Sequence, residues 1–189
     1  MKRKLLMSWL GGIALSVAGL LTLPQAHSQP SYTVPLQQMQ DAVSQRFPMR
    51  YPVGGLLDLN LQAPTLRLLP DQNRLGAAMV VDAAGPALAS STTGYFDLDF
   101  ALRYEASDQS IRAHQLRVNS LRLSGLPPGP SALLQAYGPS LANQTLQDVV
   151  VYRLRPQDLT LSDGLGFEPS TITVTTNGLR IGFVAKPQR

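Results

Sequence analysis

Strict alternation of apolar and polar residues constrains this chain more than any other feature. From Phe96 to Tyr104 every second residue is large and apolar, and the residues between them include Asp97, Asp99 and Arg103. A period of two predicts a strand with one buried and one solvated face. Residues 57–68 and 111–123 repeat the pattern, and short turns separate the segments. We therefore expect a meander of long strands.

The apolar phase reverses inside two of these strands. In residues 57–68 it changes at Pro64, and in residues 111–123 it changes near Asn119. Such a reversal indicates a β-bulge, which bends a strand and increases its twist. Long strands that bend in this way are typical of a strongly twisted, curved sheet. The sequence therefore predicts a curved sheet with an apolar concave face.

Two helices are expected to cover that face. Residues 35–47 carry an apolar stripe of helical spacing, and residues 131–147 form a second helix that Pro139 should kink or divide. Residues 155–168 are expected to be irregular. Further strands or extended segments are expected at residues 31–34, 74–84, 149–154, 171–175 and 179–184. The prediction is a single α+β domain in which a long curved antiparallel β-sheet wraps two helices.

The first 28 residues have the pattern of a secretory signal peptide. Basic residues at positions 2–4 precede an apolar run, and Ala26-His27-Ser28 supplies small residues for cleavage. This pattern predicts export, cleavage after Ser28 and a periplasmic domain of residues 29–189. The alternative is an uncleaved anchor, because the apolar run is just long enough to span a membrane. The sequence contains no Cys, and therefore no lipobox cysteine.

Charge and composition exclude several classes of function. The chain has 16 basic and 12 acidic residues, but three basic ones lie in the signal segment, so the domain itself is nearly neutral. Binding to nucleic acid needs clustered cations, and we expect no such partner. His114 is the one His of the domain, and strand parity places it on the face of Leu116, which suits a structural side chain. We expect no metal site and no cofactor.

Two polar groups on the strands have both a functional and a structural interpretation. Asp97 and Asp99 would lie on one strand face about 7 Å apart, which overlaps the carboxylate spacing of inverting glycosidases. They also fit the solvated face of an amphipathic strand, which is the interpretation we favour. Arg112, Arg117 and Arg122 repeat every five residues. They suit either a patch for anionic head groups or ordinary surface charge, and we favour the latter. No catalytic residue is therefore predicted.

A ligand pocket would be lined by the apolar faces of the strands and of the second helix. A filled core would use the same residue types, so the sequence does not separate the two. The candidate pocket residues are Leu57, Leu59, Leu61, Phe96, Leu98, Phe100, Leu102, Leu116, Val118, Leu133, Leu134 and Tyr137.

Several segments, in their order along the chain, carry a resemblance to a known family. They are Tyr32-Thr33-Val34, Phe96-Asp97-Leu98-Asp99-Phe100, Val151-Tyr152-Arg153-Leu154, Ile172-Thr173-Val174 and Gly178-Leu179-Arg180-Ile181. In this order the chain resembles the YceB-like family of bacterial periplasmic lipoproteins, a domain of unknown function. That family is similar to the tubular lipid-binding (TULIP) fold, in which a curved sheet wraps a long helix around an apolar channel. Family members commonly carry a lipobox Cys, which is absent here, and its absence favours a soluble carrier.

The leading expectation is a non-enzymatic periplasmic protein that binds or carries a lipid or other hydrophobic ligand. The ligand would lie in an apolar groove between curved sheet and helices, and transient contact with a membrane surface is a further expectation. The alternative is an envelope module with a structural or protein-interaction role, a fully packed core and an adhesive edge strand. A third interpretation is an enzyme that uses Asp97 and Asp99.

Overall fold

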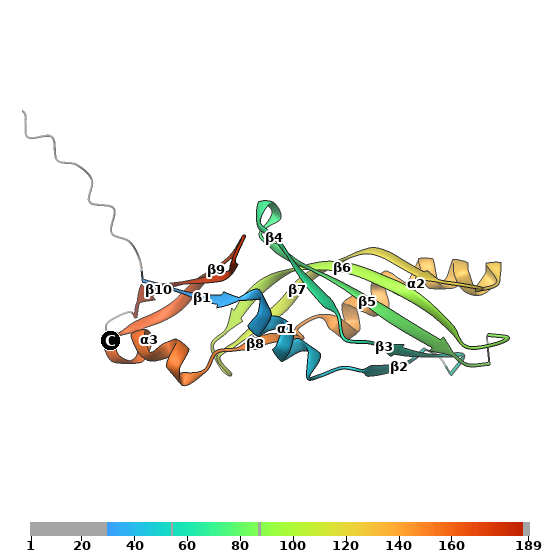
Figure 1. Cartoon of the computed structure of the whole chain (residues 1–189), viewed down its shortest axis with the longest axis horizontal. Helices are drawn as coiled ribbons and strands as arrows, with labels where there is room; N and C mark the ends of the chain where they lie inside the picture. The colour runs from blue at the N-terminus through green and yellow to red at the C-terminus, as the bar shows by residue number, and fades with distance from the viewer. Residues whose placement is uncertain (1–29, 54, 87, 187–189) are drawn as a thin grey trace, which may run out of the picture.

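The structure is a computed structural model that describes residues 30–53, 55–86 and 88–186, so the expected signal segment lies outside the described residues. The molecule is elongated and contains two antiparallel sheets (Figure 1). The larger sheet has the strand order β2-β3-β5-β6-β7-β8, and β4 also pairs with β5. Its strands are β2 (Met49–Val53), β3 (Leu57–Leu61), β4 (Thr65–Leu69), β5 (Arg74–Ala84), β6 (Thr92–Glu105), β7 (Ser110–Leu123) and β8 (Val150–Arg153).

The smaller sheet brings the two ends of the described chain together in the order β1-β10-β9. Its strands are β1 (Ser31–Pro35), β9 (Phe167–Thr175) and β10 (Gly178–Ala185). The strands expected at residues 171–175 and 179–184 are present and form an antiparallel hairpin. Thr175 pairs with Gly178, so the two-residue turn is Thr176-Asn177 and the glycine already belongs to the strand.

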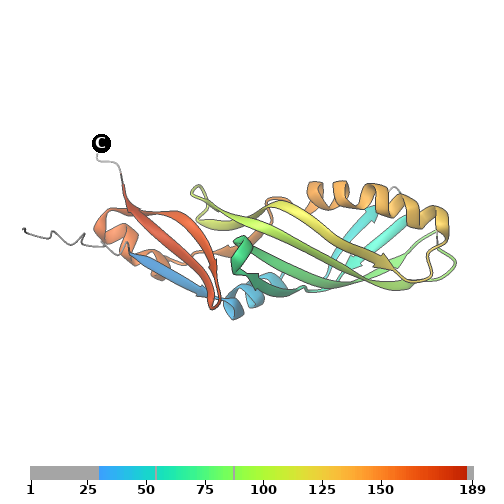
Figure 2. The ribbon, with the colours of Figure 1, turned by 90° about the horizontal axis from the view of Figure 1, so that it is seen from above.

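Helices connect and cover the sheets. The helix α1 (Leu36–Ser44) contacts β4 and β8, and α2 (Pro128–Leu146) packs along β7, as Figure 2 shows. The helix α2 is not divided at Pro139. A 3₁₀ turn, η1 (Pro70–Gln72), precedes β5, and a second, η2 (Pro156–Leu159), leads into α3 (Thr160–Leu165).

The α+β class and the curled antiparallel sheet are as predicted, but the larger sheet does not stand alone. There are two sheets and three α-helices in the described ranges. Residues 156–165, expected to be irregular, form η2 and α3 and carry the chain to a separate sheet, where β10 pairs with β1. The strand β2 was not predicted because Pro52 interrupts its pattern. As an edge strand β2 tolerates a proline.

Both predicted bulges are present. Leu61 pairs with Val81 and Thr65 with Ala78, so one extra residue lies between β3 and β4 at the Pro64 break. In β7 the register shifts at Asn119, between the pairs Asp97 with Ser120 and Leu98 with Val118. These bulges let both apolar phases of each segment face the same interior.

A third bulge overturns the placement of His114. The register between β6 and β7 shifts again at Gln115, whose φ of 50° is left-handed. Ala113 and Leu116 are therefore both buried, whereas His114 is partly exposed beside them. Simple parity failed because it assumes a strand without inserted residues.

Side-chain amides occupy the free edges of two strands. Gln40 of α1 accepts from Leu66 N at 2.8 Å and donates to the Pro64 carbonyl at 2.7 Å. Asn73, after η1, accepts from Val174 N at 2.7 Å and donates to the Ile172 carbonyl at 3.3 Å. Each amide thus satisfies backbone groups on β4 or β9 as a neighbouring strand would. Asn73 also links the larger sheet to the smaller one.

A hydrophobic core runs through the larger sheet and into the smaller one. Its most deeply buried side chains include Leu75, Val81, Ile111, Leu179 and Phe183. No helix among residues 30–53, 55–86 and 88–186 has the length and apolar character needed to cross a membrane.

Candidate ligand-binding interior

The first of two small apolar cavities lies between α2 and the larger sheet. Its volume is about 50 Å³, and its lining is almost wholly apolar. Strands β2, β3, β5, β6 and β7 supply one wall and α2 the other. The lining residues are Tyr51, Leu59, Leu61, Val81, Phe96, Leu121, Leu134, Gly138, Ala142 and Leu146.

The second cavity lies farther along the sheet, under α1. Its volume is also about 50 Å³. It is lined by Val43, Phe47, Pro64, Leu66, Ala77, Met79, Leu98, Phe100, Ala113, Leu116, Leu146, Val149 and Val151. Leu146, the last residue of α2, borders both cavities. One apolar interior is therefore partitioned at this side chain.

The size of these cavities limits what the interior holds in this conformation. A buried water needs roughly 10–15 Å³ of such volume, so each cavity has space for only a few waters. Apolar walls offer water no hydrogen bonds, and cavities of this kind stay dry. An acyl chain would have to displace side chains or move α2 outward.

Seven of the predicted pocket residues line a cavity. Leu59, Leu61, Phe96 and Leu134 line the first, and Leu98, Phe100 and Leu116 line the second. Leu57 is buried but lines neither cavity, and Leu102 and Val118 pack half-buried against the core. The side chain of Leu133 lies outside the described part of the chain.

Tyr137 was predicted to line the pocket, and this is wrong. Its side chain is 68 % exposed on the outer face of α2. The inner face instead carries Leu134, Gly138, Ala142 and Leu146, which repeat every four residues. The prediction relied on the hydrophobicity of the Tyr137 ring and omitted Gly138 and Ala142. The i, i+4 spacing of these two small residues indicates one helix face.

The two strand carboxylates are not a free pair. Asp97 forms an ion pair with Arg67 at 2.7 Å. The Arg67 hydrogen bond outweighs partial burial and, together with one from Asn119, lowers the pKa of Asp97. Asp99 is buried and paired with Arg74, and β9 packs against its strand. The expectation that both carboxylates face solvent is therefore wrong for Asp99.

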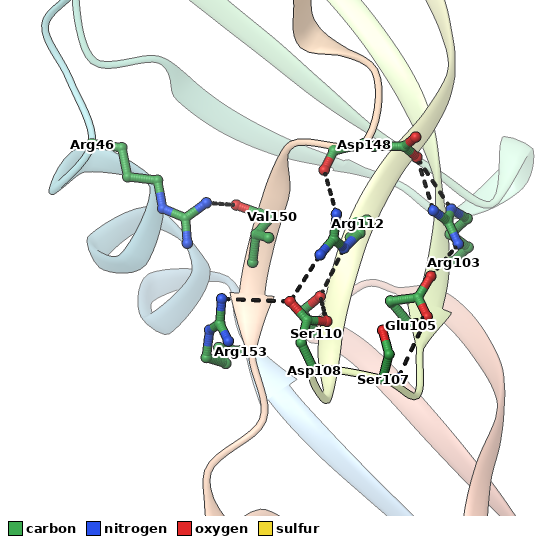
Figure 3. Close-up of polar contacts among 10 residues, drawn as sticks. All are labelled: Arg46, Arg103, Glu105, Ser107, Asp108, Ser110, Arg112, Asp148, Val150 and Arg153. Atoms are coloured by element: carbon green, nitrogen blue, oxygen red, sulfur yellow. Dashed lines mark hydrogen bonds and ion pairs between the residues drawn. The ribbon is translucent and has the colours of Figure 1, made fainter.

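The bulges of β7 decide where its arginines point. Spacings of five residues would alternate faces, but one bulge lies between Arg112 and Arg117 and another between Arg117 and Arg122. All three are therefore on the outward face. Arg112 donates to Asp108 at 2.8 Å. This contact belongs to the ion-pair network that Figure 3 shows, which consists of Arg103, Glu105, Asp108, Arg112, Asp148 and Arg153. Arg117 and Arg122 have no ion-pair partner among the described residues.

The network of Figure 3 neutralises the other arginines of this face. Arg103 binds Glu105 at 2.8 Å and Asp148 at 3.0 Å, and Arg153 lies 3.5 Å from Asp108. Across the described ranges, no group of three or more His, Asp and Glu side chains is placed to hold a metal ion.

Comparisons with known proteins find little similarity to this chain. No family model matches the chain, and no curated protein matches it. One similar solved structure is described as the crystal structure of a lipopolysaccharide binding protein, with 10 % identity and a TM-score of 0.34. The match covers 89 % of this chain and 46 % of that one, so the chain spans less than half of that protein's length. The resemblance to the YceB-like family and to the TULIP fold stays a prediction.

Proposed function

We propose that this protein binds a lipid or another apolar molecule between the larger sheet and α2. The observation that carries the proposal is the pair of adjoining apolar cavities that share Leu146, one under the inner face of α2 and the other under α1. Walls that are almost wholly apolar select an apolar ligand, and each CH₂ that it buries contributes about 0.8 kcal/mol.

Binding would require α2 to act as a movable wall. Among the described side chains of α2, the hydrogen bond from Asn143 reaches Pro139 in the same helix, and none reaches the sheet. The residues of α2 include no charged side chain, so no ion pair fixes the helix. Apolar contact is thus what holds it, and an apolar ligand can replace that contact.

The alternative, an interaction module with an adhesive edge strand, has weaker support. Gln40 and Asn73 bind the edges of β4 and β9, and Arg46 donates to the Val150 carbonyl of β8 at 2.6 Å. Edges engaged in this way are poor templates for another chain. We further propose, from the signal-peptide pattern of residues 1–28, that the protein is cleaved after Ser28 and acts in the periplasm. We also propose that it is not an enzyme.

Lipid extraction tests the proposal directly. The exported protein is purified without detergent, extracted with organic solvent and analysed by mass spectrometry. A stoichiometric lipid, or saturable binding of a fluorescent fatty acid to the delipidated protein, would support the proposal. An empty protein that also fails to bind the fatty acid would overturn it and favour the packed module.

A matched pair of variants locates the ligand. Ala142→Phe fills the first cavity, whereas Ala136→Phe adds the same ring to the exposed face of the same helix. We expect fatty-acid binding to fall at least about tenfold in the first variant and to persist in the second. Circular dichroism shows whether each variant is folded, and equal binding by two folded variants would place the ligand elsewhere.

A further inference from the structure

One end of the elongated molecule is built from three stretches that contain no charged residue, and Arg50, Asp58, Asp82 and Arg122 border it. Residues 51–57, 83–96 and 123–147 contain no Asp, Glu, Lys or Arg. These three stretches hold the β2–β3 turn, the β5–β6 loop and the β7–α2 connection, and all three meet at the right-hand end in Figure 1. We call this region the uncharged end.

Contacts join the three segments of the uncharged end into one surface. Ser124 N donates to the Thr93 carbonyl at 3.4 Å, and the Thr92 hydroxyl donates to the Ser124 carbonyl. A Cβ on Gly85 would lie 2.5 Å from the Leu56 carbonyl, so the first two segments also touch. Residues 88–92 and Ser124-Gly125 border a shallow space of about 180 Å³.

This surface exposes apolar groups and adjoins the apolar interior. Leu56 is 56 % exposed at its tip, and Leu88 and Leu126 are partly exposed. The helix α2 starts there and runs back over the first cavity with Tyr137 facing outward. The nearest charged side chains, Asp58, Asp82 and Arg122, lie where the strands leave this end, and the Thr93 hydroxyl donates to Asp82 at 2.9 Å.

We propose that the uncharged end contacts the surface of a net-neutral phospholipid bilayer, so that an apolar ligand passes between bilayer and interior beside α2. The inference rests on the proposed function and names where its ligand enters and leaves. Partial dehydration of uncharged polar loops costs less free energy than taking a charged side chain into the bilayer. Leu56 gains by leaving water, and neutrality matches a surface without net charge. Such contact requires no anionic lipid, although Arg122 pairs with Tyr95 at the border of this end.

Single tryptophan reporters test the contact. The chain's one Trp is Trp9, so a Trp9→Phe background is free of tryptophan. Leu56→Trp places a reporter on the uncharged end, and Leu165→Trp places one on α3 at the opposite end, where the native leucine is 65 % exposed. With phosphatidylcholine vesicles, we expect a blue shift of emission from residue 56 and none from residue 165. No shift at residue 56, or equal shifts, would overturn the inference.

Charge substitutions and salt supply the second readout. In vesicle flotation, Leu56→Asp should lower binding about tenfold, and the matched Leu165→Asp should leave it unchanged. Binding should be constant from about 0.05 M to about 0.5 M salt and should gain nothing from anionic lipid. Binding that needs anionic lipid and disappears in salt would overturn the inference and favour the arginines of β7. A blue shift without vesicles that grows with protein concentration would overturn it in favour of self-association.

The inference and the proposed function fail separately. If the delipidated protein binds the fluorescent fatty acid but never shifts on vesicles, the inference falls and the proposed function stands. If vesicles shift the emission of residue 56 but no fatty acid binds, the membrane contact stands and the apolar-ligand function falls.

Discussion

Gly138 of α2 lies directly against Leu121 of β7. A Cβ built on Gly138 would be 3.1 Å from Leu121 Cδ2, closer than side chains normally pack. The missing side chain therefore sets how near α2 comes to the sheet, and both residues line the first cavity. A single glycine thus allows the short distance between α2 and the sheet.

A large residue at this position should close the first cavity. We expect Gly138→Leu to abolish fatty-acid binding and to lower the free energy of unfolding by about 1–3 kcal/mol through overpacking. Ala136→Leu adds a similar side chain to the exposed face of α2 and should change neither quantity by more than about 0.5 kcal/mol. Urea denaturation and a binding titration check both variants. Undiminished binding by a folded Gly138→Leu protein would contradict the role given to this cavity.

Truncation at the partition between the cavities should separate stability from binding. Leu146→Ala is expected to lower the free energy of unfolding by about 2–5 kcal/mol because it enlarges a cavity in the core. It also joins the two cavities, so affinity for a fluorescent fatty acid should rise. Leu134→Ala removes the same atoms but borders the first cavity alone, so it should lose stability without the same gain. Equal affinities of the two variants would argue against a joined site.

The sequence predicted local features well and long-range pairing poorly. Alternation around Phe96 and the phase reversals at Pro64 and Asn119 reflect side-chain burial. The burial pattern of a strand is visible in that strand's own sequence. The pairing of β1 with β10 joins residues far apart in the chain and leaves no local signature. Within the site, the prediction for Tyr137 was wrong because it relied on hydrophobicity and not on helical spacing. The inner face of α2 uses Gly138 and Ala142, whose small size is what creates the space.

Acid should destabilise the hydrogen-bonded cluster around Asp158. This buried carboxylate of η2 accepts from Tyr152 Oη at 3.1 Å and from Arg155 N at 2.9 Å. Burial opposes its ionisation, but the hydrogen bonds from Arg155, Tyr32 and Tyr152 outweigh burial and lower the pKa of Asp158. Burial and the Asp158 charge raise the pKa of Tyr152 to about 12, so its hydroxyl stays a donor at neutral pH.

The sign of the pH dependence follows from that lowered pKa. Stabilisation by ionised Asp158 is fully present above the usual aspartate pKa of 3.8 and is lost as the pH falls through the lower folded-state value. Asp158→Asn should therefore lower stability at pH 7 by about 1–3 kcal/mol and should flatten the decline below about pH 4. Thermal unfolding between about pH 2 and 7 measures this dependence. Asp71→Asn, at an exposed carboxylate, is the control, and parallel pH profiles for all three proteins would contradict the assignment.

The amide of Asn73 should control the attachment of the smaller sheet. Its two hydrogen bonds to Ile172 and Val174 end in Asn73→Gly, although glycine adopts the φ of 53° at this position without strain. We expect a loss of about 1–3 kcal/mol, because the backbone groups of β9 lose their partner. Hydrogen exchange of the Val174 amide should accelerate in this variant and stay slow in the neighbouring control Gln72→Ala. Unchanged protection of Val174 in Asn73→Gly would show that the smaller sheet is held to the larger one by other contacts.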